Sequence, residues 1–364
     1  MSRRGDHPGL SLATTEGGGT RVHSLPARRR RPTMRDVAER ADVSLKTVSR
    51  VVNDERGVSA ALAVRVRRAI DELGFRPHPG ARLLRRSDDR TAAIALLLED
   101  VANPYSAAVQ RAVENEARAR GVVVFSASID EDPARERALA REFGARRVDG
   151  LLLAPAGEDQ SYLTEELPPG TPVVCVDREA RNLTVDSVIT TNALGAAEAV
   201  RHLAAAGHRR IAFLGDRRTI RTAEQRYSGY CDAVASLGLP FDTGLVVHDL
   251  RESADSDGAV TALLARPDPP TALFTAQNLI TIGAVRALRR LGAEWSVALV
   301  GFDDVLLADL LSPGITVVAQ DPAAIGRAAA NLLFARIGGD TSPPAVRLVP
   351  TTLIRRGSGE LRPL

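Results

Sequence analysis

The chain of 364 residues is longer than one compact core usually is, and this length favours two or three globular units. Hydrophobic residues make up 44% and charged residues 26%, as in ordinary globular proteins. No apolar run approaches the roughly 20 residues of a membrane span, and no apolar stretch follows the first arginines as in a secretory signal. We therefore expect a cytoplasmic protein that does not bind membranes.

Positive charge is concentrated near the amino end. Residues 28–86 hold 16 Lys and Arg against 7 Asp and Glu, whereas residues 87–364 carry a net charge of −7. A basic end on a mildly acidic body indicates that the protein binds nucleic acid at that end only. A basic face that is merely solvated would have the same composition. The two cysteines, Cys175 and Cys231, are far apart and lack metal-ligand spacing, so we expect reduced thiols, no metal and no cofactor.

The amino-terminal part is expected to contain a tail and a small all-α domain. Residues 1–31 are rich in Gly, Ser, Thr and Arg without periodicity, which predicts a disordered basic tail. Helical spacing of apolar residues begins at Thr33, and Ser44 and Ser59 are placed to cap a second and a third helix. Gly74 is placed to end the third helix, so residues 32–77 are expected to form a separate three-helix domain.

The first two of these helices have the spacing of a helix-turn-helix. Ala38 is small where the helices would cross, and Asp42 tolerates a left-handed backbone in the turn. Val43, Val48 and Val51 supply apolar residues at the contact between the helices. The first turns of the second helix would then present side chains to base edges in the major groove of DNA.

From residue 90 to residue 364, strands and amphipathic helices alternate. Repeated βα units predict doubly wound parallel sheets with helices on both faces, and about 275 residues are enough for two lobes. Ligands of such folds bind at the carboxyl ends of the strands, here across a cleft between the lobes. The strands are expected at Ala92–Leu98, Val122–Ser126, Gly150–Ala154, Val173–Val176, Ile211–Leu214, Leu245–Val247, Ala272–Thr275 and Val297–Gly301.

Five segments of the head carry a specific sequence pattern. They are Asp-Val-Ala-Glu at 36–39, Val-Ser at 43–44, Thr-Val-Ser-Arg-Val-Val-Asn at 47–53, Val-Ser at 58–59 and Gly-Phe-Arg-Pro at 74–77. The pattern closely resembles the head of the lactose-repressor/galactose-repressor family of bacterial transcription factors. By this resemblance the head binds a double-stranded DNA operator. Base-reading positions are then occupied by Leu45, Lys46 and Arg50, and positions that touch phosphates or support the helix by Ser44, Thr47, Ser49 and Asn53.

The resemblance also implies a hinge helix or linker at residues 78–89. In the family this segment becomes helical on DNA and, with the same segment of its dimer mate, inserts a leucine into the minor groove. Leu84 aligns with that leucine, and Arg85 with a neighbour that often contacts bases. Pro79-Gly80 replaces the family's usual small helix formers, and a glycine weakens a helix by roughly 1 kcal/mol.

Residues 90–364 resemble the family's periplasmic-binding-protein-like body, which senses an effector and dimerises through its first lobe. The resemblance implies a first lobe of about residues 90–190 and 321–345 and a second lobe of about residues 191–320. It rests on the segments Asn103–Tyr105, Val148–Gly150, Val176–Arg178, Gly207–Ile211, Gln225–Tyr230, Gly301–Asp304 and Thr316–Pro322.

Position in the family assigns effector contacts to Tyr105, Ser106, Asp177, Arg178, Arg226 and Asn278. A sugar or polyol is the family's usual effector, and a nucleoside-like compound is also considered. Ser106 and Ala197 stand where members carry an aromatic residue and an arginine, which leaves the ligand class open. Asp303 and Asp304 are assigned to the architecture of a strand end in preference to ligand contact, and Trp295 to packing at a strand entry.

The predicted protein is a dimeric regulator, favoured as a repressor, that binds a pseudo-palindromic operator and responds to a small molecule in the cleft. A homodimer is preferred to a tetramer because no heptad pattern follows Arg356. A regulator of the same fold that answers to a partner protein, or to no ligand, remains an alternative. The complete head argues against a secreted solute-binding protein. An enzyme is not expected, because phosphate-binding glycine loops, metal-ligand spacing and a nucleophile elbow are missing from the sequence.

Overall fold

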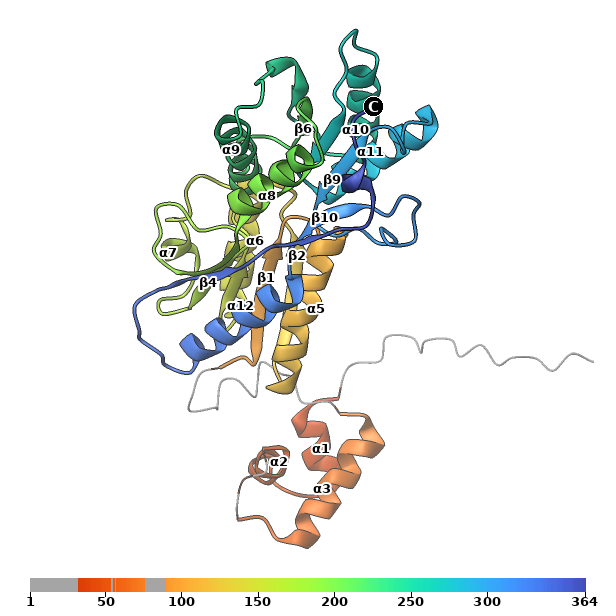
Figure 1. The fold of residues 1–364 in the computed structure, drawn as a ribbon. Coiled ribbons are helices and arrows are strands. Elements are labelled where there is room, and N and C mark those ends of the chain that lie inside the picture. The colour runs from red at the N-terminus through yellow and green to blue at the C-terminus, as the bar shows by residue number, and fades with distance from the viewer. Residues whose placement is uncertain (1–31, 54, 56, 76–89) are drawn as a thin grey trace, which may run out of the picture. The chain divides into compact units, whose positions relative to one another are not determined.

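The computed structural model describes residues 32–53, 55, 57–75 and 90–364, and it separates into one unit within residues 1–87 and a second within residues 88–364 (Figure 1). The predicted basic tail and the predicted hinge, including Leu84 and Arg85, lie outside the described residues. None of the described helices is both long and apolar enough to cross a membrane.

The first unit contains three helices, as the sequence predicts. They are α1 (Met34–Ala41), α2 (Leu45–Val52) and α3 (Ala60–Leu73). The expected caps are present, because the side chains of Ser44 and Ser59 accept the backbone N–H groups of Thr47 and Leu62 at the starts of α2 and α3. Gly74 adopts the left-handed conformation, φ 63°, that ends α3.

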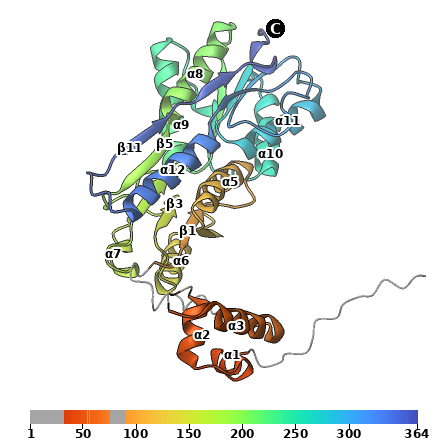
Figure 2. The ribbon, with the colours of Figure 1, turned by 90° about the horizontal axis from the view of Figure 1, so that it is seen from below.

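The second unit consists of two lobes, each built on a six-stranded sheet (Figures 1 and 2). The lobe 1 sheet has the order β11-β5-β4-β3-β1-β2, and every neighbouring pair in it is parallel. Its strands are β1 (Ala93–Leu98), β2 (Val123–Ser128), β3 (Leu151–Leu153), β4 (Val173–Val176), β5 (Asp186–Thr190) and β11 (Val346–Val349). Helices α5 (Pro104–Ala119) and α12 (Pro322–Ile337) pack against each other over one buried core, whereas α6 (Pro133–Ala145) and α7 (Leu163–Glu166) enclose the other.

The lobe 2 sheet has the order β12-β10-β9-β8-β6-β7, and only the edge pair β12–β10 is antiparallel. Its strands are β6 (Ile211–Leu214), β7 (Val246–Val247), β8 (Ala272–Thr275), β9 (Ala298–Phe302), β10 (Thr316–Ala319) and β12 (Thr352–Ile354). One core lies under α8 (Asn192–Ala205) and α9 (Arg221–Ser236), and a second lies under α10 (Ser253–Leu264) and α11 (Asn278–Leu291). Two layers of helices on each sheet form the doubly wound architecture expected from the alternating pattern.

The chain passes between the lobes three times: from β5 to α8, from β10 to α12, and from β11 to β12. Two of these crossovers are bonded to each other. The Thr190 hydroxyl donates to the Val349 carbonyl at 2.8 Å, and the Thr351 N–H donates to the Thr191 hydroxyl at 3.0 Å. The last residues of the chain therefore belong to both lobes and help to join them.

The prediction that Trp295 packs at a strand entry is wrong. Its side chain is 60% exposed in the turn that leads from α11 into β9, so it does not pack at the strand entry. The backbone of the neighbouring residues closes this turn, since the N–H groups of Ser296 and Val297 donate to the Ala293 carbonyl, and this leaves the indole outside the core.

Candidate DNA-binding head and ligand cleft

The turn between α1 and α2 is held by the residues that the sequence pattern singles out. Asp42 has φ 49° and ψ 55°, and the N–H of Val43 donates to the Ala38 carbonyl at 3.0 Å. The Arg65 guanidinium of α3 donates to the Asp42 carbonyl at 2.7 Å. The turn is therefore fixed from within and from α3, which sets the direction of α2.

One side of α2 is anchored in the core of the head. Val48 and Val51 are buried with Val37 of α1 and Val66 of α3. Ser49 is also buried, and the Asn53 side-chain amide reaches its hydroxyl at 3.5 Å, so both are placed to support the helix.

The start of α2 presents its other side to solvent. Ser44, Leu45 and Lys46 are exposed, with Leu45 at 45%, and Thr47 and Arg50 are partly exposed. The first turn of α2 contains no acidic residue, and the amino end of a helix carries partial positive charge. The exposed surface is thus suited to a polyanion such as DNA.

A narrow cavity lies between the lobes, at the carboxyl ends of the parallel strands. Its volume is about 40 Å³, far less than the roughly 300–1,000 Å³ of a typical small-molecule site. Its lining consists of Glu99, Asn103, Tyr105, Glu131, Asp177, Arg178, Asp216, Ile220, Thr222, Ala223, Arg226, Ala276, Gln277, Asp303 and Gln320.

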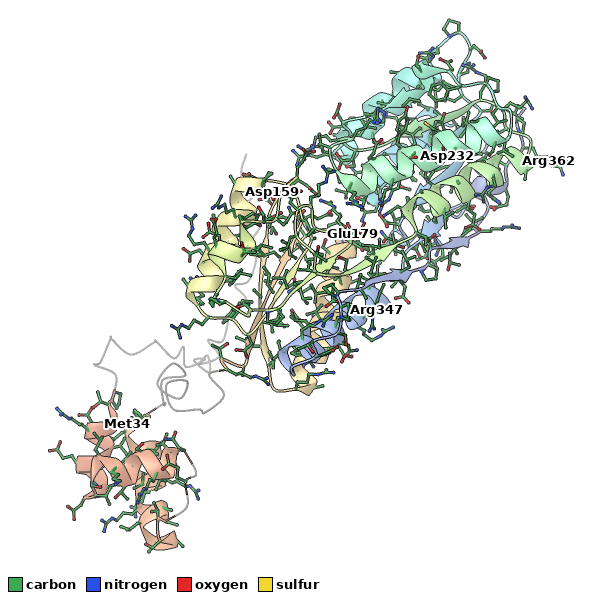
Figure 3. All side chains as sticks on the ribbon, turned by 90° about the vertical axis from the view of Figure 1, so that its left-hand side faces the viewer. Met34, Asp159, Glu179, Asp232, Arg347 and Arg362 are labelled. Atoms are coloured by element: carbon green, nitrogen blue, oxygen red, sulfur yellow. The ribbon has the colours of Figure 1, made fainter. Side chains whose placement is uncertain are left out.

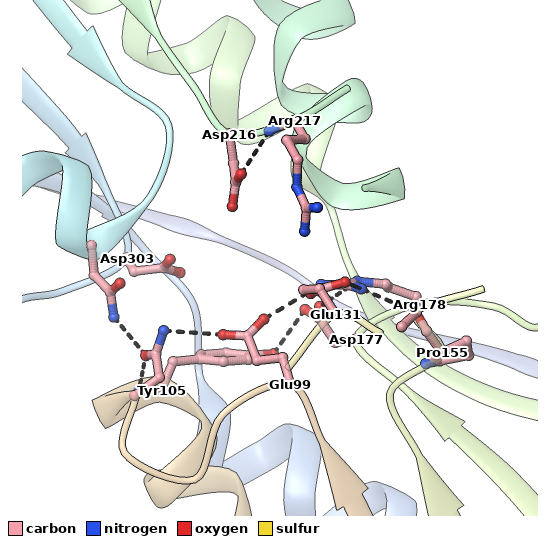
Figure 4. Close-up of polar contacts among 12 residues, drawn as sticks. Glu99, Tyr105, Glu131, Pro155, Asp177, Arg178, Asp216, Arg217 and Asp303 are labelled. Carbon is pink, nitrogen blue, oxygen red and sulfur yellow. Dashed lines mark hydrogen bonds and ion pairs between the residues drawn. The ribbon is translucent and has the colours of Figure 1, made fainter. Parts of the chain in front are cut away.

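On the lobe 1 side, Arg178 is the centre of a buried polar network (Figure 4). Its side chain is 4% exposed, and its guanidinium donates to both carboxylate oxygens of Glu131 and to the Pro155 carbonyl. Glu99 is a longer ion-pair partner at 3.4 Å. The Tyr105 hydroxyl donates to Asp177 at 3.1 Å, which fixes the ring at the floor of the cleft.

On the lobe 2 side, Arg226 is held in place by other protein groups. Its guanidinium donates to the Asn192 side chain and to the Ala276 carbonyl, both at 2.8 Å, and lies 3.9 Å from the centre of the Phe302 ring. Asp303 approaches it at 3.6 Å and accepts a hydrogen bond from Gln320 at 2.6 Å. A preorganised guanidinium of this kind loses little conformational entropy when it binds an acceptor.

Burial changes the acidity of several groups in the cleft. It raises the pKa of Glu99 to about 8, against the lowering effect of Arg178 and with a further rise from Asp177, Glu131 and Asp303. Burial also raises the pKa of Asp216 and that of Asp303. These carboxyl groups therefore hold their protons more readily than surface carboxyl groups do, because burial penalises the charged form.

The two lobes are in contact across the cleft. Asn278 of α11 donates to the Asn103 side chain of lobe 1 at 2.8 Å, and Arg221 of α9 pairs with Glu179 of lobe 1 at 2.5 Å. Glu179 is seen on lobe 1 in Figure 3. Because these contacts span a cavity of only about 40 Å³, a sugar-sized ligand requires the lobes to move apart or the lining to rearrange.

The structure places four of the six predicted effector residues in the cavity wall, namely Tyr105, Asp177, Arg178 and Arg226. Asn278 is buried behind Asn103, whereas Ser106 is buried in α5 and is not part of the lining. Asp303, which was assigned to strand-end architecture, also lines the cavity, but Asp304 instead pairs with Arg356 at 2.7 Å.

Several lining residues escaped the sequence analysis although a signal for them exists. Glu99, Glu131, Asp216, Gln277 and Gln320 each follow the carboxyl end of a strand by one to three residues. The rule that ligands bind at this edge of a parallel sheet would have selected them.

Larger cavities occur on lobe 1, but they lie elsewhere. One of about 430 Å³ is bounded by residues 163–173 and 183–186, at the amino ends of β4 and β5. Its polar wall includes Asp186, whose carboxylate pairs with Arg336 at 2.6 Å and is thereby satisfied. The smaller cavity is the better candidate for the ligand site, because it has charged groups from both lobes at the edge where ligands of parallel sheets bind.

Within the described part of the chain, no cluster of His, Cys, Asp and Glu is arranged to hold a metal ion.

Comparison with known proteins agrees with this division into head and body. The family of bacterial regulatory proteins called lacI matches residues 33–78, and the periplasmic binding protein-like domain matches residues 200–359. The transcriptional regulator PtxS of Pseudomonas aeruginosa is 35% identical over 338 residues, which cover 92% of this chain and 97% of that protein. The chain belongs to the LacI family.

Further LacI-family relatives cover nearly the whole chain. The transcriptional repressor CytR of Escherichia coli (strain K12) is 30% identical over 91% of this chain and 97% of its own. The structure of the transcriptional regulator CelR in complex with cellobiose is 32% identical, with a TM-score of 0.66, and the match covers 90% of this chain and 100% of CelR. As a LacI-family member, the chain is a DNA-binding transcriptional regulator with a helix-turn-helix head and a periplasmic-binding-protein-like body.

Proposed function

We propose that this LacI-family protein is a repressor that binds a pseudo-palindromic operator as a homodimer. The proposal is supported chiefly by the inter-lobe cavity, whose charged walls come from both lobes, because a ligand there would change how the lobes are oriented. We place the protein in the cytoplasm, where it has access to DNA, and assign it no catalytic activity.

On the head, Leu45, Lys46 and Arg50 are proposed to read bases. Arg50 is suited to a bidentate contact with guanine, and Leu45 to apolar contact with a thymine methyl group. Ser44, Thr47, Ser49 and Asn53 are proposed to bind phosphates or support α2, with the buried Ser49 in the supporting role. Residues 78–89 are proposed to form the hinge, with Leu84 inserted into the minor groove and Arg85 in contact with bases.

The effector is proposed to be a sugar or polyol that contacts Tyr105, Asp177, Arg178 and Arg226. The complex of the relative CelR with cellobiose supports this ligand class. Ser106 and Asn278 would take part only if opening of the cleft exposes them, since both are buried. A coupling free energy of roughly 1–3 kcal/mol between ligand and operator is enough for a working switch.

Lobe 1 is proposed to form the dimer interface. Val123 and Phe125 on the edge strand β2 are 57% and 43% exposed, and nearby Val101 is 40% exposed. The N–H of Val101 donates to the Ser128 hydroxyl at the end of β2, so the Val101 backbone lies beside this strand. An exposed apolar region on a sheet edge is typical of a protein–protein interface.

The function is tested by selecting genomic fragments with the purified protein, with and without pools of sugars, polyols and nucleosides. We expect one palindromic site to be enriched and one pool to abolish or strengthen that enrichment. Enrichment that no pool alters would favour a regulator controlled by a partner protein. Failure to enrich any site would contradict the proposed function.

A further inference from the structure

The cleft between the lobes contains more acidic than basic side chains. Five carboxyl groups and two guanidinium groups line it, and these belong to Glu99, Glu131, Asp177, Asp216, Asp303, Arg178 and Arg226. Both guanidinium groups are already engaged, since Arg178 binds Glu131 and Arg226 binds Asn192 and the Ala276 carbonyl. Arg178 also forms ion pairs with Glu99 and Asp177, and Arg226 forms one with Asp303, so Asp216 is the lining carboxylate without such a partner among the described residues. Even with Arg217, whose side chain points into the space between the lobes in Figure 4, the carboxyl groups outnumber the guanidinium groups.

The surplus comes from both lobes. Asp216 extends from the end of β6 toward the cleft, and Glu99 lies on the opposite side (Figure 4). The Asp216 carboxylate accepts the N–H of Arg217 at 2.6 Å and forms no ion pair with any side chain in the described part of the chain. Glu99 is 3.4 Å from Arg178, which is itself bonded more closely to Glu131.

Two further polar atoms of the region have unmet hydrogen-bonding capacity. The Oε1 atom of Gln320, which lines the cavity, is buried without a partner. Its Nε2 atom donates to Asp303, which fixes the orientation of the amide and leaves Oε1 as an acceptor. The Nε atom of Arg217, whose side chain points into the space between the lobes in Figure 4, is a buried donor without a partner. A ligand that satisfies both atoms must offer a donor and an acceptor.

The cavity offers little for an aromatic ligand. Tyr105 is the one aromatic side chain among its described lining residues, and its hydroxyl is bound to Asp177. A nucleobase is usually held by stacking on aromatic rings, so this lining favours a non-aromatic, strongly hydrogen-bonding molecule.

We infer that the effector is a small polyhydroxylated amine, whose ammonium group is balanced by the surplus carboxylates and whose hydroxyl groups pair with Gln320 and Arg217. The inference rests on the proposed function, because it assigns a ligand class to the same cleft. Glu99 keeps its proton near neutral pH, so the charge left without an ion-pair partner by a neutral sugar is chiefly that of Asp216. A sugar acid would add a further negative charge. A bound ammonium group removes this cost.

The test uses two probe series in which only one substituent changes its charge. The first series is 1-amino-1-deoxysorbitol, sorbitol and gluconate, which differ at C1, and the second is 6-amino-6-deoxyglucose, glucose and glucuronate, which differ at C6. Binding to the full chain is measured by calorimetry and thermal shift at pH 6.5, where the amines carry their proton. We expect an amine to bind about tenfold or more tightly than its matched alcohol, and the acids to bind most weakly.

Asp216→Asn should abolish the preference for the amine over its matched alcohol, and Asp303→Asn provides a second variant if the first does not fold. Asp232→Asn serves as the control, because Asp232 is exposed on α9 and labelled on lobe 2 in Figure 3. An alcohol or acid that binds as tightly as its amine overturns the inference, as does the absence of binding by every amine.

Operator selection is measured with the same preparations so that the two claims can fail separately. If a neutral sugar changes operator binding, the proposed function stands and the inference about charge fails. If no operator is selected, the proposed function itself is contradicted.

Discussion

Two aspartates occupy matching positions in the two lobes. Asp177 follows β4 and Asp303 follows β9, and their φ values are 67° and 69°. In each case the backbone N–H donates at 2.9 Å to the neighbouring strand, to Val188 and to Val318 respectively. A left-handed non-glycine residue costs about 1–3 kcal/mol and is commonly retained at functional sites. The repeated conformation directs a carboxylate from each lobe into the same cleft.

Glu99 should make the stability of the body depend on pH. The pKa of its carboxyl group is about 8 in the folded protein, above the ordinary value of 4.5, so the folded state retains a proton that the unfolded state releases. Its contribution to stability is complete below pH 4.5 and is lost as the pH rises through 8. We expect Glu99→Gln to raise the melting temperature relative to the wild type increasingly between pH 5 and pH 8.5.

Thermal denaturation of both proteins over this range checks the prediction. Glu142→Gln on the exposed surface of α6 is the control for loss of an acid. Parallel melting curves for Glu99→Gln and the wild type at every pH would show that Glu99 does not titrate as described.

Arg50 is the residue of the head whose loss should reduce specificity most. Arg50→Ala is expected to weaken binding to the selected operator by roughly 1–3 kcal/mol and to relax the base preference at one position in each half-site. Arg68→Ala on α3 is the matched control, since the Arg68 side chain is 80% exposed and pairs with Glu72. Measurement on operator and on random DNA separates the effects, and an equal loss on both would rule out a base-reading role for Arg50.

At the scale of helices and strands, close packing in lobe 2 depends on particular glycines. A Cβ atom at Gly229 of α9 would lie 2.1 Å from the Ala193 carbonyl oxygen of α8, and this oxygen belongs to the backbone and cannot rotate away. Gly258 of α10 has no atom within 4 Å of the equivalent position. Only the first glycine is therefore required by packing.

We expect Gly229→Ala to lower the free energy of unfolding by about 1–3 kcal/mol or more, because α8 and α9 must separate. Gly258→Ala should instead raise it by about 0.5–1 kcal/mol, since alanine favours a helix. Denaturant unfolding of the two variants gives the comparison. If both variants are stabilised, α8 and α9 pack less closely than the structure shows.

The elements with strong periodicity were predictable from sequence. Ser44, Ser59 and Gly74 marked the helix ends of the head, and the long helices and the buried central strands of the body lie within a few residues of their expected positions. β5, β10, β11 and β12 were not identified as strands. β5 begins with the buried polar pair Asp186-Ser187, and β11 and β12 are edge strands with exposed side chains, so their local sequences lack a clear apolar run. Long-range pairing determines β5, β11 and β12, whereas β10 is a fully buried strand of the sequence Thr-Val-Val-Ala that its own apolar pattern could have identified.

The site was less predictable than the fold for a related reason. The family resemblance selected Tyr105, Asp177, Arg178 and Arg226, which line the cleft. It also selected Ser106, which is buried and does not line the cleft. The burial of Ser106 depends on how α5 packs, and the surplus of acid depends on strand ends that meet only in the folded body. Neither property can be read from local sequence.

At the scale of the whole molecule, the proposed homodimer should depend on the exposed strand β2. We expect Val123→Arg to convert the dimer into a folded monomer, because a charge on the edge strand would have to be desolvated in the interface. Sedimentation at micromolar concentration measures this, and Leu194→Arg, at an exposed apolar position of lobe 2, is the control. A dimer that survives Val123→Arg would place the interface elsewhere.

Because of the three crossovers between the lobes, lobe 1 cannot be completed during synthesis until most of lobe 2 has been made. α12 and β11 belong to lobe 1, yet Arg336, which pairs with Asp186 of β5, is made 150 residues after it. At about 5–20 residues per second, the ribosome needs roughly 8–30 seconds to supply this partner. Until then one apolar face of the lobe 1 sheet, with Ile94 and Val174, is covered by α5 but lacks its second helix, α12. The nascent chain should therefore need protection from aggregation in that interval, and the cavity between the lobes is complete only after Gln320, the last of its lining residues, has left the ribosome.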